Sequence, residues 1–258
     1  TALLGSNCGI DYPEAVARAN FLCDEYGMDT MSTGGVIAFA MECYERGLIT
    51  KEDTEGIDLR FGNHEAMIQM VEKIALRKGF GNTLAEGVKR FSEKIGHGSD
   101  AFAIHVKGLE FPSWDPRGLK GSGLAFATSH RGACHKRGIM GEEIFKKSGF
   151  SIENKAALVK QTQDSVALFF SLGVCRFITM ATPLSQWVKL LTSATGINFD
   201  EAKLMLAGER IETLTRLFNV REGFTRKDDN LPRRLMEEPM PEGPAKGQLL
   251  TKEELDKM

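Results

Sequence analysis

One stretch decides how this chain folds: PEAVARANFLCDEYGMD, residues 13–29. Its proline suits the first turn of a helix, where the missing N–H group leaves no intrahelical hydrogen bond unmade, and Asp11 is a candidate cap. The apolar run continues through Ala19 and Cys23 and stops at Gly27. Glycine often ends a helix because it enters the left-handed conformation without strain. The stretch therefore predicts a helix that ends at Gly27.

The same organisation recurs along most of the chain. Apolar residues three or four positions apart predict further helices over about 33–46, 63–78, 83–95, 153–172, 184–194 and 199–217. Residues 103–106 are typical of a short strand, and residues 108–123 are rich in glycine and proline. The sequence thus predicts an all-α protein with two packed helical subdomains and at most a few short strands.

Helical periodicity gives way near residues 100–105 to a short extended segment and then to sequence rich in glycine and proline. This change predicts the boundary between the subdomains. We expect residues 1–103 to form one helical unit and residues 104–258 to form the other. From about Asp228 the chain carries several prolines and many charges with little periodicity, so we expect an extended surface tail or disorder there.

Composition excludes several classes of function. With 42% hydrophobic and 26% charged residues the chain has the composition of a soluble globular protein, and its net charge of −2 favours neither nucleic acid nor an anionic membrane. No apolar run approaches the roughly 18 residues of a membrane helix, and no signal peptide is visible. The five cysteines form no CxxC pair and no disulfide framework, so we expect a reducing cytoplasm.

The glycine stop at the end of the first helix has a second copy. Residues 24–29 read DEYGMD and residues 170–175 read FSLGVC, each with a potential ligand two positions after the glycine. Asp24 and Asp29 either accept hydrogen bonds from the N–H groups of a ligand or cap the following turn. Cys175 is either a ligand for a soft metal or iron–sulfur cluster or a small buried hydrophobe. Two copies with different ligand chemistry suggest that the two motifs contact one cofactor from two places. We call them the two arms of one cofactor site.

A basic cluster, SHRGACHKR at residues 129–137, stands out in this near-neutral chain. Its cations can contact an anion or a cofactor phosphate, and one of its histidines, His135, can transfer a proton near neutral pH. The alternative is a solvated positive face of a helix. The residues alone do not choose between these two interpretations.

Taken with their surroundings, the two motifs resemble segments of the tungsten-containing aldehyde ferredoxin oxidoreductase family. The matching stretches span nearly the whole chain in the family's order: NFLCDEYGMDTMSTGG (20–35), AME (40–42), LAEGVKR (84–90), DPRG (115–118), ATSHRGACH (127–135) and REGFTRKDD (221–229). The resemblance implies a mononuclear tungsten, or molybdenum, held by two pterin dithiolenes beside a [4Fe–4S] cluster. It also implies that small aldehydes are oxidised to carboxylic acids, with ferredoxin accepting the electrons.

By this resemblance, each motif would contact one of the two pterins. The residues concerned are Asp24, Gly27 and Asp29 in the first motif and Gly173, Val174 and Cys175 in the second. The thiolate of Cys175 would also bind an iron, as the fourth ligand of a cluster whose other three cysteines this chain does not supply. The dithiolene sulfurs would hold the metal, the carboxylates the pterin edges, and the cluster would carry electrons away.

Two residues of the basic cluster also receive roles from the resemblance. His135 matches a histidine near the metal that positions or protonates substrate, a role that His130 fits less well. Arg137 would help to hold a pterin. One residue departs from the family pattern, because the second motif should open with an acid and here opens with Phe170. The hydrogen bond of that acid must be lost, replaced elsewhere, or unnecessary in this subgroup.

The resemblance covers the rest of the family's second domain and its third domain. The family's N-terminal β-rich domain, with a cysteine triplet and a glutamate proposed as general acid–base, would precede Thr1. We therefore expect the isolated chain to be a fragment that needs this N-terminal domain as its partner, and to bind neither tungsten nor cluster stably. No nucleic-acid or membrane partner is expected, and a homo-oligomer stays open.

Two other functions stay open at this point. One is a divergent member of the family that reduces a carboxylic acid or an aromatic thioester, which the departure at Phe170 favours. The other is a cofactor-free helical scaffold. A scaffold has no need of Asp24, Asp29, His135 and Cys175 together, so their joint presence favours an enzyme.

Overall fold

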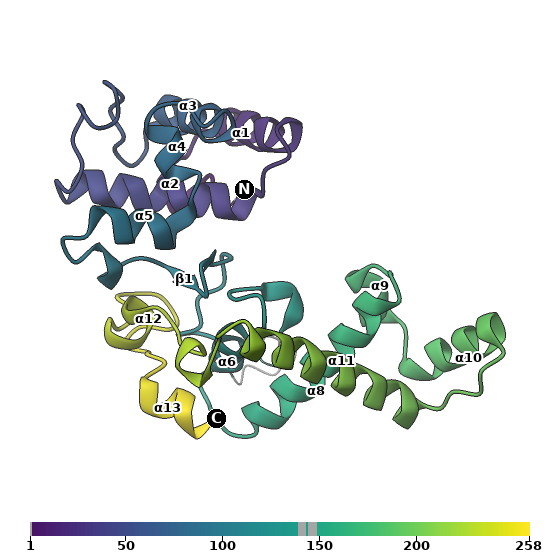
Figure 1. The fold of residues 1–258 in the computed structure, drawn as a ribbon. Coiled ribbons are helices and arrows are strands. Elements are labelled where there is room, and N and C mark those ends of the chain that lie inside the picture. The colour runs from purple at the N-terminus through teal and green to yellow at the C-terminus, as the bar shows by residue number, and fades with distance from the viewer. Residues whose placement is uncertain (1, 139–142, 144–148) are drawn as a thin grey trace. The chain divides into compact units, whose positions relative to one another are not determined.

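The computed structural model describes residues 2–138, 143 and 149–258. Within them the protein is mainly helical, which confirms the predicted all-α class (Figure 1). The described strands are β1 (His105–Val106) and β2 (Leu109–Glu110), an antiparallel pair in which His105 lies opposite Glu110. No helix of this described part is long and apolar enough to cross a membrane.

The chain forms two compact units, and both of them are discontinuous in sequence. Unit 1 contains Thr1–Trp114 and Leu231–Glu238, and unit 2 contains Asp115–Asn230 and Pro239–Met258. The first division thus falls after Trp114, later than the boundary expected near residue 103. The strand pair accounts for this difference, because β2 packs on helices of unit 1 and the buried Glu110 side chain accepts a hydrogen bond from the amide of Val88 at 2.7 Å.

Unit 1 is organised around one central helix. Its helices are α1 (Pro13–Glu25), α2 (Thr30–Glu45), α3 (His64–Ala75), α4 (Phe80–Leu84), α5 (Gly87–Ile95) and α12 (Arg233–Glu237), with short 3-10 turns at Ser6–Cys8 and Ser99–Ala101. Helix α2 contacts α1, α3, α4, α5 and β2, and every residue from Val36 to Met41 is buried. A helix that is apolar on all sides belongs at the centre of a core, which is where α2 lies.

The C-terminal tail is folded rather than extended. It contains α12 and α13 (Lys252–Lys257), and it buries Leu231, Leu235, Leu250 and Leu255. These helices have five and six residues, too few for a helical period to be recognised in the sequence. The expectation of an extended tail from Asp228 is therefore not met in the described residues.

Helix α12 is held on α2 by a bidentate ion pair. Both terminal nitrogens of Arg234 donate to the carboxylate of Glu42, at 2.9 and 2.5 Å, and Nε of Arg46 donates to the same group at 2.9 Å. The two guanidiniums lie 5.7 Å (Arg234) and 4.3 Å (Arg46) from the ring centroid of Phe102. Paired hydrogen bonds of this kind fix orientation as well as distance.

This ion pair predicts how the stability of unit 1 depends on pH. Burial alone would raise the pKa of Glu42, but the hydrogen bonds from Arg234 and Arg46 outweigh it and lower that pKa below its ordinary value. A carboxyl whose pKa is lower in the folded state contributes stability above its unfolded pKa and loses it as the pH falls through the folded pKa. We therefore expect wild-type stability to decline below about pH 4.3, the ordinary pKa of glutamate.

The matching variant is Glu42→Gln, measured by thermal unfolding between pH 3 and pH 8. It should lower the unfolding free energy at pH 7 by about 1–2 kcal/mol, since a charged acceptor of three hydrogen bonds is lost, and it should flatten the acid decline. The control is Glu45→Gln, which changes an exposed carboxylate on the same helix. Parallel pH curves for wild type and Glu42→Gln would contradict the prediction.

Unit 2 is organised around two long packed helices, α8 (Lys155–Ser171) and α11 (Glu201–Arg221). The helices α6 (Lys120–Thr128), α9 (Arg176–Ala181), α10 (Leu184–Thr195) and α13, and the 3-10 turns η3 (His135–Arg137) and η4 (Arg226–Asp228), complete its described part. At Gly208 of α11 an added Cβ would lie 2.2 Å from the carbonyl oxygen of Asp164 in α8, so glycine permits this close approach. The long helices predicted for this half of the chain are confirmed.

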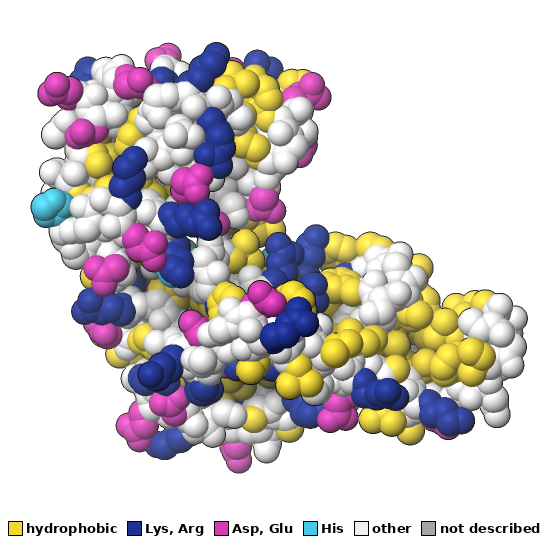
Figure 2. Space-filling model, in the orientation of Figure 1, with side chains coloured by type: hydrophobic (Ala, Val, Ile, Leu, Met, Phe, Trp, Pro, Cys, Tyr) yellow, Lys and Arg dark blue, Asp and Glu magenta, His cyan; other side chains and the backbone are white. Residues whose placement is uncertain are grey.

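Large apolar side chains are exposed on one part of unit 2. Figure 2 shows them gathered over the end of the unit that Figure 1 labels α9, α10 and α11. They are Phe177, Ile178, Leu190, Ile197, Leu206, Leu214, Leu217, Phe218 and Val220. Single exposed apolar residues are normal on protein surfaces, so it is their number here that distinguishes this part of unit 2 from the rest of the unit.

Candidate cofactor site

The first motif lies at the junction of α1 and α2 in unit 1. Gly27 has φ +67°, and the amide of Met28 donates to the carbonyl of Cys23 at 2.8 Å, which closes the end of α1. An added Cβ at Gly27 would meet nothing within 4 Å, so the backbone conformation rather than crowding favours glycine. The helix end predicted at Gly27 is confirmed, and the space beside it is open.

The two carboxylates of this motif have different local partners. Asp29 is the N-cap of α2, and its Oδ1 accepts hydrogen bonds from the amides of Met31 and Ser32 at 2.9 and 2.8 Å. Asp24 is exposed in the last turn of α1, and its Oδ2 accepts a hydrogen bond from the side chain of Asn20 at 3.2 Å. The capping interpretation is thus correct for Asp29. Each carboxylate nevertheless keeps one oxygen that accepts nothing from the described residues and can bind further donors.

The second motif repeats this geometry at the junction of α8 and α9 in unit 2. Gly173 has φ +68°, an added Cβ there would meet nothing within 4 Å, and the half-buried Val174 follows it. Cys175 is the N-cap of α9, as Asp29 is of α2, but its side chain makes no capping hydrogen bond. It is exposed, whereas the other four cysteines are buried. The interpretation of Cys175 as a small buried hydrophobe is therefore wrong.

The described residues around Cys175 do not complete a metal site. Among the described residues, no three or more His, Cys, Asp and Glu side chains gather in a way that could hold a metal ion. A [4Fe–4S] cluster usually takes four cysteine thiolates. An exposed thiol that belongs to no such group of described residues fits the role of one ligand of a cluster, with the others coming from elsewhere.

The basic cluster is a loop followed by the 3-10 turn η3, so it does not present a helix face. His130 is held by α11: its Nδ1 lies 3.1 Å from Oε1 of Glu212, and its carbonyl accepts a hydrogen bond from the side chain of Asn219 at 2.6 Å. His135 is half-buried at the start of η3. The contacts of His130 hold the loop that leads to His135.

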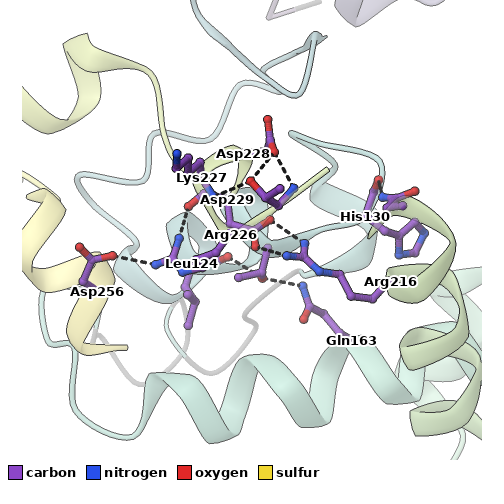
Figure 3. Close-up of polar contacts among 12 residues, drawn as sticks. Leu124, His130, Gln163, Arg216, Arg226, Lys227, Asp228, Asp229 and Asp256 are labelled. Atoms are coloured by element: carbon purple, nitrogen blue, oxygen red, sulfur yellow. Dashed lines mark hydrogen bonds and ion pairs between the residues drawn. The ribbon is translucent and has the colours of Figure 1, made fainter. Parts of the chain in front are cut away.

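The segment that follows α11 is fixed in the same region by ion pairs and hydrogen bonds (Figure 3). Asp229 is 4% exposed and forms two hydrogen bonds with Arg216, at 2.8 and 2.7 Å. Its carbonyl accepts from Arg226 at 2.6 Å, and Arg226 also donates to Asp256 of α13 at 2.7 Å. Residues 221–229, one of the stretches that resemble the family, therefore link α11 to α13 within unit 2. Their sequence alone does not reveal this role.

Arg137 lies against the first residue of the second motif. Its guanidinium carbon is 5.1 Å from the ring centroid of Phe170, a cation–π distance, and η3 packs on α8. The structure thus brings Arg137 and the second motif together in unit 2, although they are far apart in the sequence. The residues of the first motif gather separately, in unit 1.

Sequence reasoning missed one buried carboxylate of unit 2. The side chain of Glu143 is fully buried, accepts hydrogen bonds from the amides of Gly121 and Ser122 at 2.7 and 2.9 Å, and pairs with Lys155 at 2.9 Å. It caps α6, whose first eight residues are all buried. The sequence around Glu143 gives no sign of such a role, because its partners come from other segments.

Comparison with known proteins matches the whole chain to one family. The family model described as "Aldehyde ferredoxin oxidoreductase, domains 2 & 3" covers residues 1–258. Tungsten-containing aldehyde ferredoxin oxidoreductases are 43% identical in Pyrococcus abyssi and 41% identical in Thermococcus kodakarensis, over 99% and 98% of this chain and 43% of each relative. The chain therefore spans less than half the length of these curated relatives.

Two more distant proteins are also similar. The "Aliphatic sulfonate oxidoreductase, WOR-like subunit" of Pyrococcus furiosus is 31% identical over 98% of this chain and 40% of that protein. Among solved structures, the active site complex BamBC of benzoyl coenzyme A reductase with 1,5-dienoyl-CoA aligns with a TM-score of 0.67 and 22% identity, over 95% of this chain and 46% of that one. At this identity the structural likeness concerns the fold.

Proposed function

Since this chain belongs to the aldehyde ferredoxin oxidoreductase family, we propose that it is part of a tungstopterin enzyme that oxidises small aldehydes to carboxylic acids. The reaction converts an aldehyde and water into a carboxylic acid, two protons and two electrons, and ferredoxin takes the electrons. The observation that carries the proposal is the family match over the entire chain. Because the relatives are longer, the proposal concerns the complete polypeptide.

A tungsten held by two pterin dithiolenes would supply the two-electron oxidation when bound. The residues of the first motif fit a pterin, because Asp24 and Asp29 each have an acceptor oxygen to spare for its N–H edge. The open space at Gly27 and Gly173 leaves room for a flat ring to approach the backbone. In the second arm, Cys175 would bind an iron of the [4Fe–4S] cluster through its exposed thiol.

We assign the proton-handling role to His135. Oxidation of the aldehyde by water releases protons, and an imidazole is the side chain best suited to accept them near neutral pH. His130 is less suited because its ring is committed to Glu212 and its carbonyl to Asn219. The cytoplasm is the proposed compartment, since free thiols persist there and all five cysteines of the chain are free.

The test is to express the complete polypeptide anaerobically with tungstate and to measure tungsten, pterin and iron together with aldehyde-dependent reduction of ferredoxin. We expect all three cofactor components and activity in the complete polypeptide. The isolated 258-residue chain is the control, and we expect neither tungsten nor cluster in it. A complete polypeptide without tungsten would refute the proposed function, and a stoichiometric cluster in the isolated chain would refute the assignment of the other ligands to the N-terminal part.

A second candidate is the reduction of a carboxylic acid or an aromatic thioester by a divergent member of the family. Phe170 favours it, since a changed residue in a cofactor-binding motif is expected where the chemistry has changed. The same preparation distinguishes the two candidates. Faster turnover of a thioester or an acid with reduced ferredoxin than of any aldehyde with oxidised ferredoxin would favour the reductase.

A further inference from the structure

The two motifs differ in charge. The first carries the carboxylates of Asp24 and Asp29, and neither forms an ion pair with a described residue. The second motif contains no carboxylate. It is flanked instead by two guanidiniums, that of Arg137 on the ring of Phe170 and that of Arg176 directly after the motif. One arm is therefore suited to N–H donors, and the other is suited to acceptors.

The guanidinium of Arg137 has donors to spare. No carboxylate of the described residues pairs with it, and its Nε is buried without a hydrogen-bond partner there. A guanidinium carries five N–H donors in a fixed plane, and a buried donor without an acceptor is costly. An oxygen acceptor from a ligand would therefore supply the hydrogen bond that the buried Nε of Arg137 lacks among the described residues.

Arg176 repeats this pattern on the other side of the motif. One of its terminal nitrogens donates to Oγ1 of Thr179 at 3.0 Å, while its Nε is also buried without a partner in the described part of the chain. Burial lowers the pKa of Arg176, but an arginine remains protonated at neutral pH. Two partly buried cations with no counter-charge among the described residues therefore flank one six-residue motif.

Phe170 explains why no described carboxylate pairs with Arg137. The acid expected at this position by the family pattern would neutralise a guanidinium placed beside it. An aromatic ring instead attracts the cation through its face and leaves the N–H donors at the edge of the guanidinium plane unused. The substitution thus keeps Arg137 in place without consuming its hydrogen-bonding capacity.

We propose that Phe170 positions Arg137 to bind an anionic oxygen group, so that the second arm of this protein is an anion subsite. The ligand chemistry is a phosphate or carboxylate, whose oxygens match the planar fork of a guanidinium. Two sources fit, the phosphate of the pterin cofactor and the carboxylate of the reaction product, and this choice of sources depends on the proposed function. Phe170 is a positioning residue, because it acts through Arg137.

The test uses four variants of the complete enzyme: Arg137→Gln, Arg137→Lys, Phe170→Leu and Phe170→Asp. If the anion is the cofactor phosphate, Arg137→Gln and Phe170→Asp should release tungsten and pterin about tenfold faster on dialysis, equivalent to about 1.4 kcal/mol. Phe170→Leu should have a smaller effect, and Arg137→Lys should recover part of the retention because it keeps the charge. Arg137→Gln is the deciding variant, since it leaves the apolar packing of Phe170 intact.

A matched control lies on α11, where the guanidinium of Arg221 is 4.8 Å from the ring centroid of Phe218. Arg221→Gln breaks the same kind of stack away from the second motif and should leave cofactor release unchanged. If the anion is the product carboxylate instead, cofactor release should stay at the wild-type rate in Arg137→Gln while the inhibition constant for acetate rises about tenfold. Wild-type release together with wild-type acetate inhibition would overturn the proposal.

A separate measurement distinguishes failure of this proposal from failure of the proposed function. If the wild-type polypeptide carries no tungsten, the function is refuted, and inorganic phosphate then serves as the probe. Phosphate should raise the Tm of the wild type and of Arg221→Gln more than that of Arg137→Gln. An equal rise in all three proteins would refute the anion subsite as well.

Discussion

Cys175→Ser is expected to remove the [4Fe–4S] cluster from the complete enzyme. Ferredoxin reduction by aldehyde should then fall by about 100-fold or more, or roughly 3 kcal/mol, because electrons have no route out of the site. Clusters are held by thiolates, and a serine hydroxyl stays protonated at neutral pH. The side chain of Cys175 is exposed and makes no capping hydrogen bond, so the substitution should leave the fold unchanged. Iron and sulfide content, visible absorption and the EPR spectrum of the reduced protein measure the result.

The control for this variant is Cys134→Ala, which removes a buried thiol from the same unit. It should cost stability, since it leaves a small cavity, and it should retain the cluster. The assignment of Cys175 as a cluster ligand would fail if Cys175→Ser kept a full cluster and wild-type electron transfer.

His135→Asn is expected to lower kcat by about 10²–10⁴-fold while tungsten and iron contents stay at the wild-type level. This is the range that removal of a positioned acid or base produces. The pH profile of kcat should also lose the limb that this imidazole contributes, which a purely structural histidine would not affect. Steady-state kinetics with ferredoxin between pH 5 and pH 9 provide the measurement.

His130→Asn is the companion variant. It breaks the 3.1 Å contact with Glu212 and should lower the Tm while leaving the shape of the pH profile intact. If the two variants exchanged these effects, the catalytic role would belong to His130 and the loop would be held by other contacts.

The elements that could be predicted from the sequence are those fixed by neighbouring residues. A helix stop depends on the residue that must enter the left-handed region, so the two glycine stops were recognisable, and Gly27 and Gly173 have nearly equal φ values of +67° and +68°. The long helices of both units follow from apolar periodicity. The paired motif is a local feature, and its geometry is correspondingly well predicted.

The features that escaped prediction depend on residues that are distant in sequence. Arg137 and Phe170 meet because η3 packs on α8, and no local pattern links them. Whether Cys175 is exposed was undecidable, since an apolar helix end is compatible with either environment until its neighbours are placed. The short α12 was missed for the same reason, because it is stabilised by contact with α2 rather than by its own sequence.

The discontinuity of unit 1 has a consequence for synthesis on the ribosome. Arg234 is 192 residues after its partner Glu42. At about 5–20 residues per second, roughly 10–40 s separate the translation of the two. Unit 1 therefore cannot be completed co-translationally until most of unit 2 has been made. A premature stop codon anywhere between residues 115 and 230 would leave unit 1 without its last helix, α12. We expect such a product to be cleared by quality control.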